Sequence, residues 1–233
     1  MKVNRLDWLR VLKIVKSVGA NEVKFDEQGR FSAVGGDGSM LLFGQGLSLY
    51  KEIALMDVDM LIKMLDAFVD AEINVEIKDS KLMLGSEGLV FGYRLALPEV
   101  VESIPLEKKE ELLKGQWVEQ SFYYEQVVPV NDLIKTLTVH KVSFVMEEGR
   151  LVAVVGDRKR FYGQLYFGNS GLSLPVEFSF DADKLKSVFD VVDNNKVIIG
   201  FKWENEGNIV VPKIVKIEQK DFCWFIGALT EKE

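Results

Sequence analysis

The sequence predicts an α+β fold built from two similar tandem domains, each with an antiparallel sheet and two helices. The first observation is local. The stretch 57–68 (DVDMLIKMLDAF) has helical spacing of apolar residues between two alternating segments, and 181–192 (DADKLKSVFDVV) repeats this arrangement. The second observation is the spacing. Four positions match at a constant offset of 124 residues: Asp57 with Asp181, Asp59 with Asp183, Leu61 with Leu185, and Leu65 with Phe189. A repeat of this period in 233 residues indicates two similar halves.

Matches further upstream extend the repeat. They pair Gly29–Asp37 with Gly149–Asp157 (offset 120), Val23–Phe25 with Val142–Phe144 (offset 119), and Val3–Leu6 with Val130–Leu133 (offset 127). The larger last offset predicts that the first helix is one to two turns longer in the first half. We therefore expect an N-terminal domain over 1–98, a connector over 99–118 and a C-terminal domain over 119–233.

Composition favours a soluble globular protein, with 48% hydrophobic and 28% charged residues. No apolar run approaches the ~20 residues of a membrane span, and the N-terminus lacks a signal-peptide apolar segment. The single cysteine, Cys223, excludes an internal disulfide and is expected to be buried, which predicts a cytoplasmic protein. The net charge of −7 argues against a protein coated in basic residues, but it leaves room for a localised basic surface.

The first predicted helix is amphipathic, and its cations gather on one face. Asn4 is a plausible N-cap, and Gly19 ends the helix near Val18. One face gathers Trp8, Val11, Leu12, Val15 and Val18. The other gathers Lys2, Arg5, Arg10, Lys13 and Lys16, with Leu6 and Leu9 among them. This basic face is either an ordinary solvated surface or a stripe that faces phosphates.

Strands and turns fill the rest of the first half. The expected strands are 21–25, 29–34, 39–44, 47–56, 73–79, 81–87 and 89–97. The glycine-rich 35–38 (GGDG) is a predicted hairpin turn, because it lacks the Lys-Ser/Thr of a phosphate loop and precedes no helix. Asp57 or Asp59 is expected to cap the helix that follows.

The stretch Pro98–Trp117, which covers most of the connector, interrupts the strand pattern with two prolines and a charge cluster, and we expect a helical turn within 106–114. In the second half, 120–128 is a predicted strand and Asn131 a predicted N-cap of a short helix ending near Val139. A second helix is expected over 183–192. The remaining predicted strands are 142–146, 151–155, 161–167, 175–180, 196–203, 209–217 and 222–229.

The sequence nominates no catalytic set and no cofactor. One histidine, His140, and one cysteine do not make a conventional zinc site. Nucleophile-elbow, Walker and dinucleotide motifs are absent. Carboxylate pairs at Asp57/Asp59 and Asp181/Asp183 could serve acid–base or metal chemistry, but both stand where helix capping explains them. We therefore expect a protein that is not an enzyme.

Two segments, Ile53–Ile77 and Tyr93–Val101, carry a resemblance to DNA sliding clamps, and in particular to those of T-even-type bacteriophages. The first resembles the strand–Asp–helix–strand segment of the first clamp domain. The second resembles the strand end and proline that open the connector. The duplicated halves, the acidic total charge and the cation-bearing helices agree with this PCNA-like family.

The resemblance implies a processivity factor in which three subunits form a head-to-tail ring around duplex DNA, without sequence preference, and tether the replicative polymerase. It implies a clamp loader as a further partner, and the host cytoplasm as the location if the protein is viral. By analogy, strand Leu89–Ala96 would pair with Arg160–Gly168 of the next subunit.

The resemblance also assigns candidate site residues. The DNA-facing cations would be Arg5, Arg10, Lys13, Lys16, Lys63, Lys135, Lys141, Lys184 and Lys186. In the 57–68 helix, however, Lys63 is outnumbered by acids. Partner peptides would bind near the connector, at Val100, Val101, Ile104, Leu112 and Leu113.

Two other classes stay open at this point. A duplicated β-rich ligand-binding or structural protein would be a monomer or dimer with no DNA role. An enzyme that uses a carboxylate pair would lose activity, without loss of folding, on substitution of Asp57/Asp59 or Asp181/Asp183.

Overall fold

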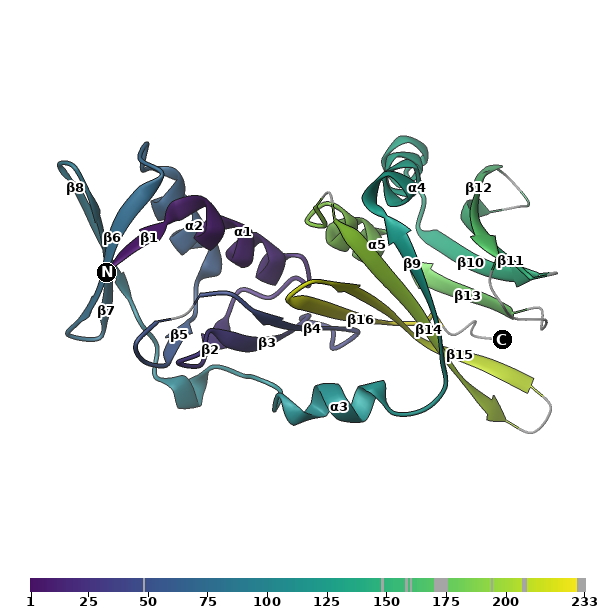
Figure 1. Ribbon diagram of the computed structural model, residues 1–233, viewed down its shortest axis with the longest axis horizontal. Helices are drawn as coiled ribbons and strands as arrows, with labels where there is room; N and C mark the ends of the chain where they lie inside the picture. The colour runs from purple at the N-terminus through teal and green to yellow at the C-terminus, as the bar shows by residue number, and fades with distance from the viewer. Residues whose placement is uncertain are drawn as a thin grey trace. The chain divides into compact units, whose positions relative to one another are not determined.

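A computed structural model describes residues 1–47, 49–147, 149–157, 159, 161–169, 176–193, 195–206 and 209–229. The chain divides into two compact units, Met1–Leu112 and Leu113–Glu233. Each is described by itself (Figure 1). Arg160 and Pro175, which begin two of the predicted strands, lie outside the described residues.

The first unit contains eight strands, two core helices and the start of the connector within its described residues. In chain order these are β1 (Lys2–Asn4), α1 (Arg5–Lys16), β2 (Val23–Phe25), β3 (Arg30–Val34), β4 (Met40–Gln45), β5 (Ile53–Leu55), α2 (Val58–Asp66), β6 (Glu72–Lys78), β7 (Lys81–Ser86) and β8 (Leu89–Arg94). The connector follows with a 3-10 turn, η1 (Pro98–Val100), and with α3 (Glu107–Leu113), which ends at the boundary between the units.

The second unit repeats the order of strands and core helices. Its elements are β9 (Trp117–Tyr123), α4 (Tyr124–Leu137), β10 (Lys141–Glu147), β11 (Arg150–Asp157), β12 (Phe161–Asn169), β13 (Val176–Asp181), α5 (Ala182–Phe189), β14 (Lys196–Glu206), β15 (Ile209–Gln219) and β16 (Phe222–Gly227). Both units therefore read strand, helix, four strands, helix, three strands.

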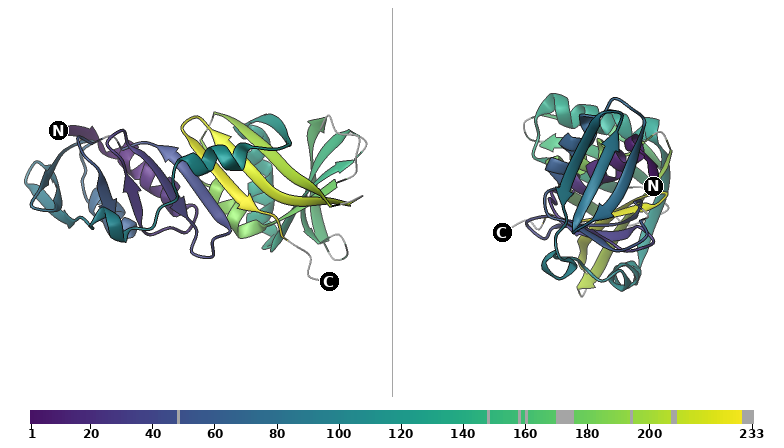
Figure 2. Two further views of the ribbon diagram at one scale, coloured as in Figure 1. Left: turned by 90° about the horizontal axis from the view of Figure 1, so that it is seen from below. Right: turned by 90° about the vertical axis from the view of Figure 1, so that its left-hand side faces the viewer.

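Strand pairing confirms the duplication. In the first unit, strands pair antiparallel in the orders β5-β2-β3-β4 and β1-β6-β7-β8; in the second, the corresponding orders are β13-β10-β11-β12 and β9-β14-β15-β16. Figure 2 shows strands β6, β7 and β8 as one layer of the first unit. The predicted α+β class, with two similar halves of antiparallel sheet and two helices each, is thus confirmed.

Apolar side chains from helices and sheets form the core of each unit. In the first unit, Leu12 and Leu61 are fully buried, and the rings of Phe25 and Phe31 pack with centroids 4.9 Å apart. In the second unit, Phe144 packs against Phe201 at 5.1 Å. These contacts bury the apolar stripes that predicted the helices, which is the main source of their stability. Cys223 is buried, as expected.

Helix starts follow the predicted caps. The Asn4 side chain accepts a hydrogen bond from the Leu6 N–H at 2.8 Å, and Asp57 accepts one from the Met60 N–H at 2.9 Å. Asp181 accepts from the N–H groups of Asp183 and Lys184 at 2.9 and 3.2 Å. Each cap satisfies backbone donors that the first helical turn leaves without partners.

Two details of the first half differ from expectation. Leu9, assigned to the polar face of the first helix, is only 5% exposed, whereas Leu6 is 55% exposed as expected. The buried stripe of α1 is therefore wider than the one predicted. The strand expected over 47–56 is confined to Ile53–Leu55 in the described residues. The 35–38 segment is the predicted hairpin turn, closed by the Gly38 N–H on the Gly35 carbonyl at 2.8 Å.

The first helix of the second half starts earlier than predicted. Strand β9 ends at Tyr123, and α4 begins at Tyr124 and includes Pro129. Gln126 caps its start by accepting the Tyr123 N–H at 2.9 Å. Pro129 lies early in the helix, so its missing N–H removes only one bond near the N-terminus. Asn131 is consequently not an N-cap but a buried residue inside the helix.

The prediction that the first helix is longer in the first half is wrong, because α4 starts earlier than expected. Helix α4 has 14 residues and α1 has 12. Their first residues, Arg5 and Tyr124, are 119 positions apart, the same offset that relates Val23 to Val142. The match between 3–6 and 130–133 is therefore a coincidence of sequence that the structure does not follow.

The connector contains the expected helical turn, observed as α3. Within the first unit, the Ser32 hydroxyl donates to the Ile104 carbonyl at 2.7 Å and accepts from the Ile104 N–H at 2.9 Å. Within the second unit, the Trp117 indole donates to the Leu113 carbonyl at 3.2 Å, and Lys202 donates to the Lys114 carbonyl at 2.6 Å. Both ends of α3 are therefore attached to a folded unit.

Candidate nucleic-acid interface

The two helices of the first unit pack against each other and run antiparallel (Figure 1). At one end, the Arg5 guanidinium donates to the carbonyls of Asp70 at 3.0 Å and Leu65 at 3.3 Å, just at and beyond the end of α2. At the other end, Lys16 forms an ion pair with Asp59 at 2.9 Å. These contacts fix the side chains of two candidate cations, Arg5 and Lys16, against helix α2 and the residues that follow it.

Two of the other three candidate cations of the first unit are more accessible. Lys13 on α1 and Lys63 on α2 are exposed, and neither makes an ion pair within the described part of the chain. Arg10 is half-buried. Four of the five candidates in this unit therefore lie on α1, so α1 is its main basic element.

The helices of the second unit converge on one carboxylate. Asp190, the C-cap residue of α5, accepts hydrogen bonds from Lys135 of α4 at 2.7 Å, Lys186 of α5 at 2.7 Å and the Asn131 amide at 2.8 Å. Burial alone would raise the pKa of Asp190, but the hydrogen bonds from Lys135, Lys186 and Asn131 outweigh it and lower the pKa to about 2. The hydrogen bond to Asp190 raises the pKa of Lys135.

The remaining two candidates of the second unit lie apart from this network. Lys184 is half-buried on α5. Lys141 is the first residue of strand β10, not part of a helix, and it pairs with Glu177 of β13 at 3.5 Å. The candidate cations of this unit are thus divided among two helices and a strand.

Three of the four carboxylates considered for catalysis have structural partners. Asp57 and Asp181 cap α2 and α5, and Asp59 pairs with Lys16. Among the described residues, no group of three or more His, Cys, Asp or Glu side chains is arranged to hold a metal ion. No described helix is long and apolar enough to cross a membrane.

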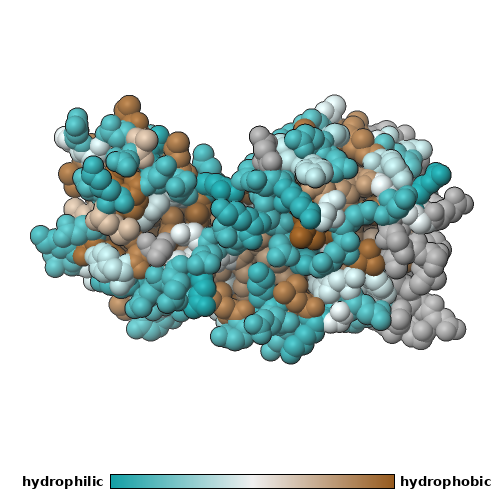
Figure 3. Space-filling model, viewed as in Figure 1, coloured by the Kyte–Doolittle hydropathy of each residue, from teal (hydrophilic) through white to brown (hydrophobic). Residues whose placement is uncertain are grey.

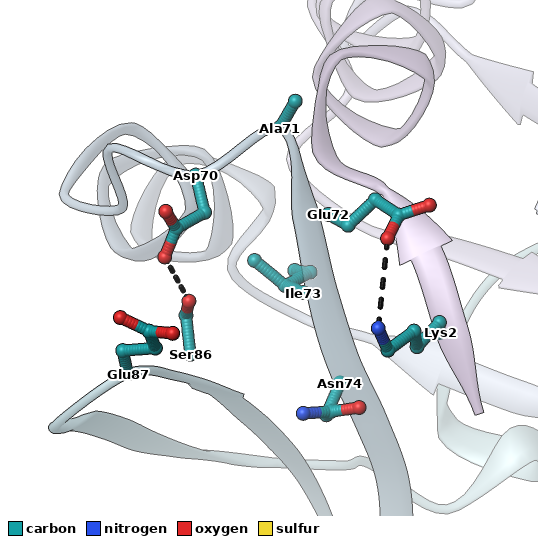
Figure 4. Close-up of a pocket in the computed structure, with 8 residues that line it drawn as sticks. All are labelled: Lys2, Asp70, Ala71, Glu72, Ile73, Asn74, Ser86 and Glu87. Carbon is teal, nitrogen blue, oxygen red and sulfur yellow. Dashed lines mark hydrogen bonds and ion pairs between the residues drawn. The ribbon is translucent and has the colours of Figure 1, made fainter.

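A polar pocket of about 440 Å³ lies in the first unit (Figure 4). Its lining includes Asp70, Glu72 and Glu87. Lys2 is paired with Glu72 at 3.7 Å, and the Ser86 hydroxyl donates to Asp70. Because acids outnumber the single lysine, the pocket repels phosphate and is not part of the candidate interface.

The residues proposed to bind partner peptides differ in accessibility. Val100 is 58% exposed, whereas Val101 is only 4% exposed. Ile104, Leu112 and Leu113 are half-buried. Adjacent apolar residues in an irregular segment have no periodicity that would separate them, so sequence reasoning treated the two valines alike.

The two strands nominated for subunit pairing are edge strands of their sheets. β8 ends the order β1-β6-β7-β8, and β12 ends the order β13-β10-β11-β12. Both expose large apolar side chains, with Val90 at 65%, Tyr162 at 49% and Tyr166 at 62%. On the face shown in Figure 3, hydrophobic residues otherwise form separate patches on a mostly hydrophilic surface. Edge strands with exposed apolar residues are suited to pairing with another chain.

Asp190 is the residue of the candidate interface that sequence reasoning missed. Its offset of 124 from Asp66 places it within the repeat, and that was the available signal. What the repeat does not reveal is that three side chains from two helices meet there.

No protein-family model matches the sequence, and no curated protein matches it significantly. The fold, however, matches solved structures over nearly the whole chain. The DNA polymerase III beta subunit of Thermotoga maritima aligns at a TM-score of 0.68 and 12% identity, covering 99% of this chain and 64% of that one. The chain thus spans somewhat less than two thirds of that subunit.

PCNA structures align along almost their full length. The PCNA2–PCNA3 complex of Sulfolobus tokodaii has a TM-score of 0.69 and 12% identity, covering 97% of this chain and 98% of that one. The Proliferating Cellular Nuclear Antigen of Entamoeba histolytica has a TM-score of 0.69 and 12% identity, covering 98% of both chains. The protein therefore has the sliding-clamp fold. Its length is close to that of these PCNA chains.

Proposed function

We propose that this protein is a sliding clamp that encircles duplex DNA and tethers a replicative DNA polymerase for processive synthesis. The observation that carries the proposal is the duplicated clamp fold with a cation-bearing α1 in a chain of net charge −7. Sliding needs weak contacts to phosphates without base readout, which lysine and arginine on a helix face supply. Acidic residues elsewhere repel DNA from other surfaces.

The ring is a head-to-tail homotrimer in this proposal. Edge strand β8 of one subunit pairs with β12 of the next, so that Val90 and the two exposed tyrosines become covered. The domains are 1–98 and 119–233, with 99–118 as the connector. The protein has no chemistry of its own, acts in the cytoplasm, depends on a clamp loader, and belongs with the clamps of T-even-type bacteriophages.

Partner peptides dock beside the connector. Val100 is the accessible contact, and Ile104, Leu112 and Leu113 offer partly exposed side chains. Val101 instead packs inside the first unit and supports the segment. The attachment of both ends of α3 keeps this segment ordered before a partner arrives, which reduces the entropy cost of binding.

The first experiment is the solution mass, measured by light scattering over a dilution series. A mass near three times the 26.4 kDa of one chain supports the ring. The matched variants are Val90→Lys and Tyr166→Lys, which place a charge on each nominated edge, with Lys220→Glu in an exposed turn as the control. Strictly monomeric protein at high concentration, with and without circular duplex DNA, would contradict the proposal.

A further inference from the structure

Asp190 lies between two of the four candidate DNA-binding cations of the second unit. Its carboxylate contacts the ammonium groups of Lys135 and Lys186, both at 2.7 Å. The side chains of these lysines are 45% and 36% exposed, so water and a phosphate can reach them. The carboxylate itself is 33% exposed. One acid therefore competes with DNA for two of the candidate cations.

The carboxylate is the fixed member of this network. Asn131, a residue of α4, donates to this carboxylate at 2.8 Å and is only 7% exposed. At the offset of 119, Asn131 occupies the position of Leu12, which is fully buried in the first unit. An amide at a core position costs desolvation unless it is bonded. Here the amide N–H is bonded to Asp190, whereas the amide oxygen has no hydrogen-bond partner among the described residues.

The first unit lacks the equivalent restraint. Asp66 is the counterpart of Asp190 at the offset of 124, and it makes no ion pair within the described part of the chain. At the position that corresponds to Asn131, the first unit has Leu12, which carries no side-chain donor. The arrangement around Asp190 is thus a property of the second unit and not of the repeated fold.

We propose that Asp190 is a positioning residue that holds Lys135 and Lys186 and lowers their contribution to phosphate binding, so that the second unit grips DNA more weakly than its cation content suggests. The inference rests on the proposed clamp function. A phosphate must displace an internal carboxylate before it gains either lysine, and this limits the number of counterions released on binding. A weaker grip favours sliding over static binding.

The test compares Asp190→Asn with Asp66→Asn. Both remove one negative charge at equivalent positions, but only the first releases two lysines. Binding of each full-length chain to a mixed-sequence linear duplex is measured by fluorescence anisotropy across a sodium chloride series. We expect Asp190→Asn to bind about threefold or more tighter than Asp66→Asn at low salt. Its slope of log K against log salt should be steeper by about one, because additional phosphate contacts form.

A second pair of measurements separates this effect from a general change in folding. The double substitution Lys135→Met with Lys186→Met should abolish the gain from Asp190→Asn, so that the triple variant binds within about twofold of the double variant. Equal affinity and equal salt slope of Asp190→Asn and Asp66→Asn would overturn the inference. A gain from Asp190→Asn that persists after both lysines are removed would also overturn it.

Failure of the proposed function has a different signature. If the wild-type chain shows no salt-dependent duplex binding, and substitutions of Arg10 and Lys13 change nothing, the clamp proposal and this inference fall together. If the wild-type chain binds and the α1 substitutions weaken it, while Asp190→Asn behaves as Asp66→Asn, only the role of Asp190 is wrong.

Discussion

The two helix pairs share one framework but distribute charge differently. At the offset of 119, buried Val11 and Val15 of α1 correspond to buried Val130 and Ile134 of α4. Only one of the four candidate cations of α1 has a cation at the matching position. The α1 residues Arg5, Arg10, Lys13 and Lys16 correspond to Tyr124, Pro129, Asp132 and Lys135. Apolar positions are held by packing, whereas exposed charges are free to vary because the fold does not depend on them.

In the second helix of each unit the difference in charge is reversed, because here the second unit carries the additional cations. Lys184 and Lys186 of α5 take the positions of Met60 and Ile62 in α2. In the first unit the positive charge is thus concentrated on the first helix, and in the second unit part of it lies on the second helix. There the C-cap residue, Asp190, neutralises some of it. The two units therefore carry unequal distributions of positive charge on the same framework.

The largest effect should come from breaking what the two units share. Leu61→Ala and Leu185→Ala each remove a fully buried side chain at matched positions, and each should lower the free energy of unfolding by about 2–5 kcal/mol. Urea denaturation checks this, with the 43%-exposed Met60→Ala as the control that should cost well under 1 kcal/mol. Unequal losses at the two leucines would show that the units pack differently despite their common topology.

Charge reversal on α1 should have the next largest effect. It should weaken the binding of duplex DNA and leave the stability of the fold unchanged. Arg10→Glu with Lys13→Glu should weaken duplex binding at least tenfold at low salt, because it replaces two cations by two acids on the main basic element. Anisotropy and primer-extension length on circular template measure the loss. Reversal at Lys220, in an exposed turn of the second unit, should leave both readouts within about twofold of wild type. Equal losses at both sites would contradict a localised interface.

The smallest effect should be the acid dependence of stability that Asp190 introduces in the second unit. Its pKa is lowered to about 2 in the folded chain, against about 3.9 in an unfolded one. The unfolded chain then binds the proton first, so this stabilisation is present above about pH 4 and is lost as pH falls through about 2. The stability difference between wild type and Asp190→Asn should narrow over that window.

Calorimetry between pH 2 and pH 5 measures this narrowing. The control is the chain with Lys135→Met and Lys186→Met, in which the hydrogen bonds that lower the pKa are reduced and the same narrowing should shrink. A stability difference that stays constant across the window would show that the network around Asp190 contributes no linked stability.

Much of the fold was predictable because its signals are local. Asn4 and Asp57 cap helices through bonds to residues two and three positions away, and the leucines of α2 recur at helical spacing. The start of α4 was not predictable in this way. Residues 120–128 were predicted to form a strand, but the pairing of β9 with β14 ends at Tyr123. That pairing joins residues far apart in the chain.

The site shows the same division. The basic face of α1 was visible in the sequence, because residues at helical spacing share a face whatever the rest of the chain does. The separation of Val100 from Val101 was not visible, because burial of a connector residue depends on the surface beneath it. Nor was the role of Asp190, whose Asn131 partner is 59 residues away.

The sequence by itself determined the duplicated α+β framework, the caps and the basic first helix, because each follows from neighbours within a few turns or from repetition of a pattern. Only the tertiary structure decided which cations remain available and which are held by a carboxylate. The physical reason is that ion pairs and burial act across space. Lys135, Lys186 and Asn131 meet Asp190 only after two helices have packed on their sheets.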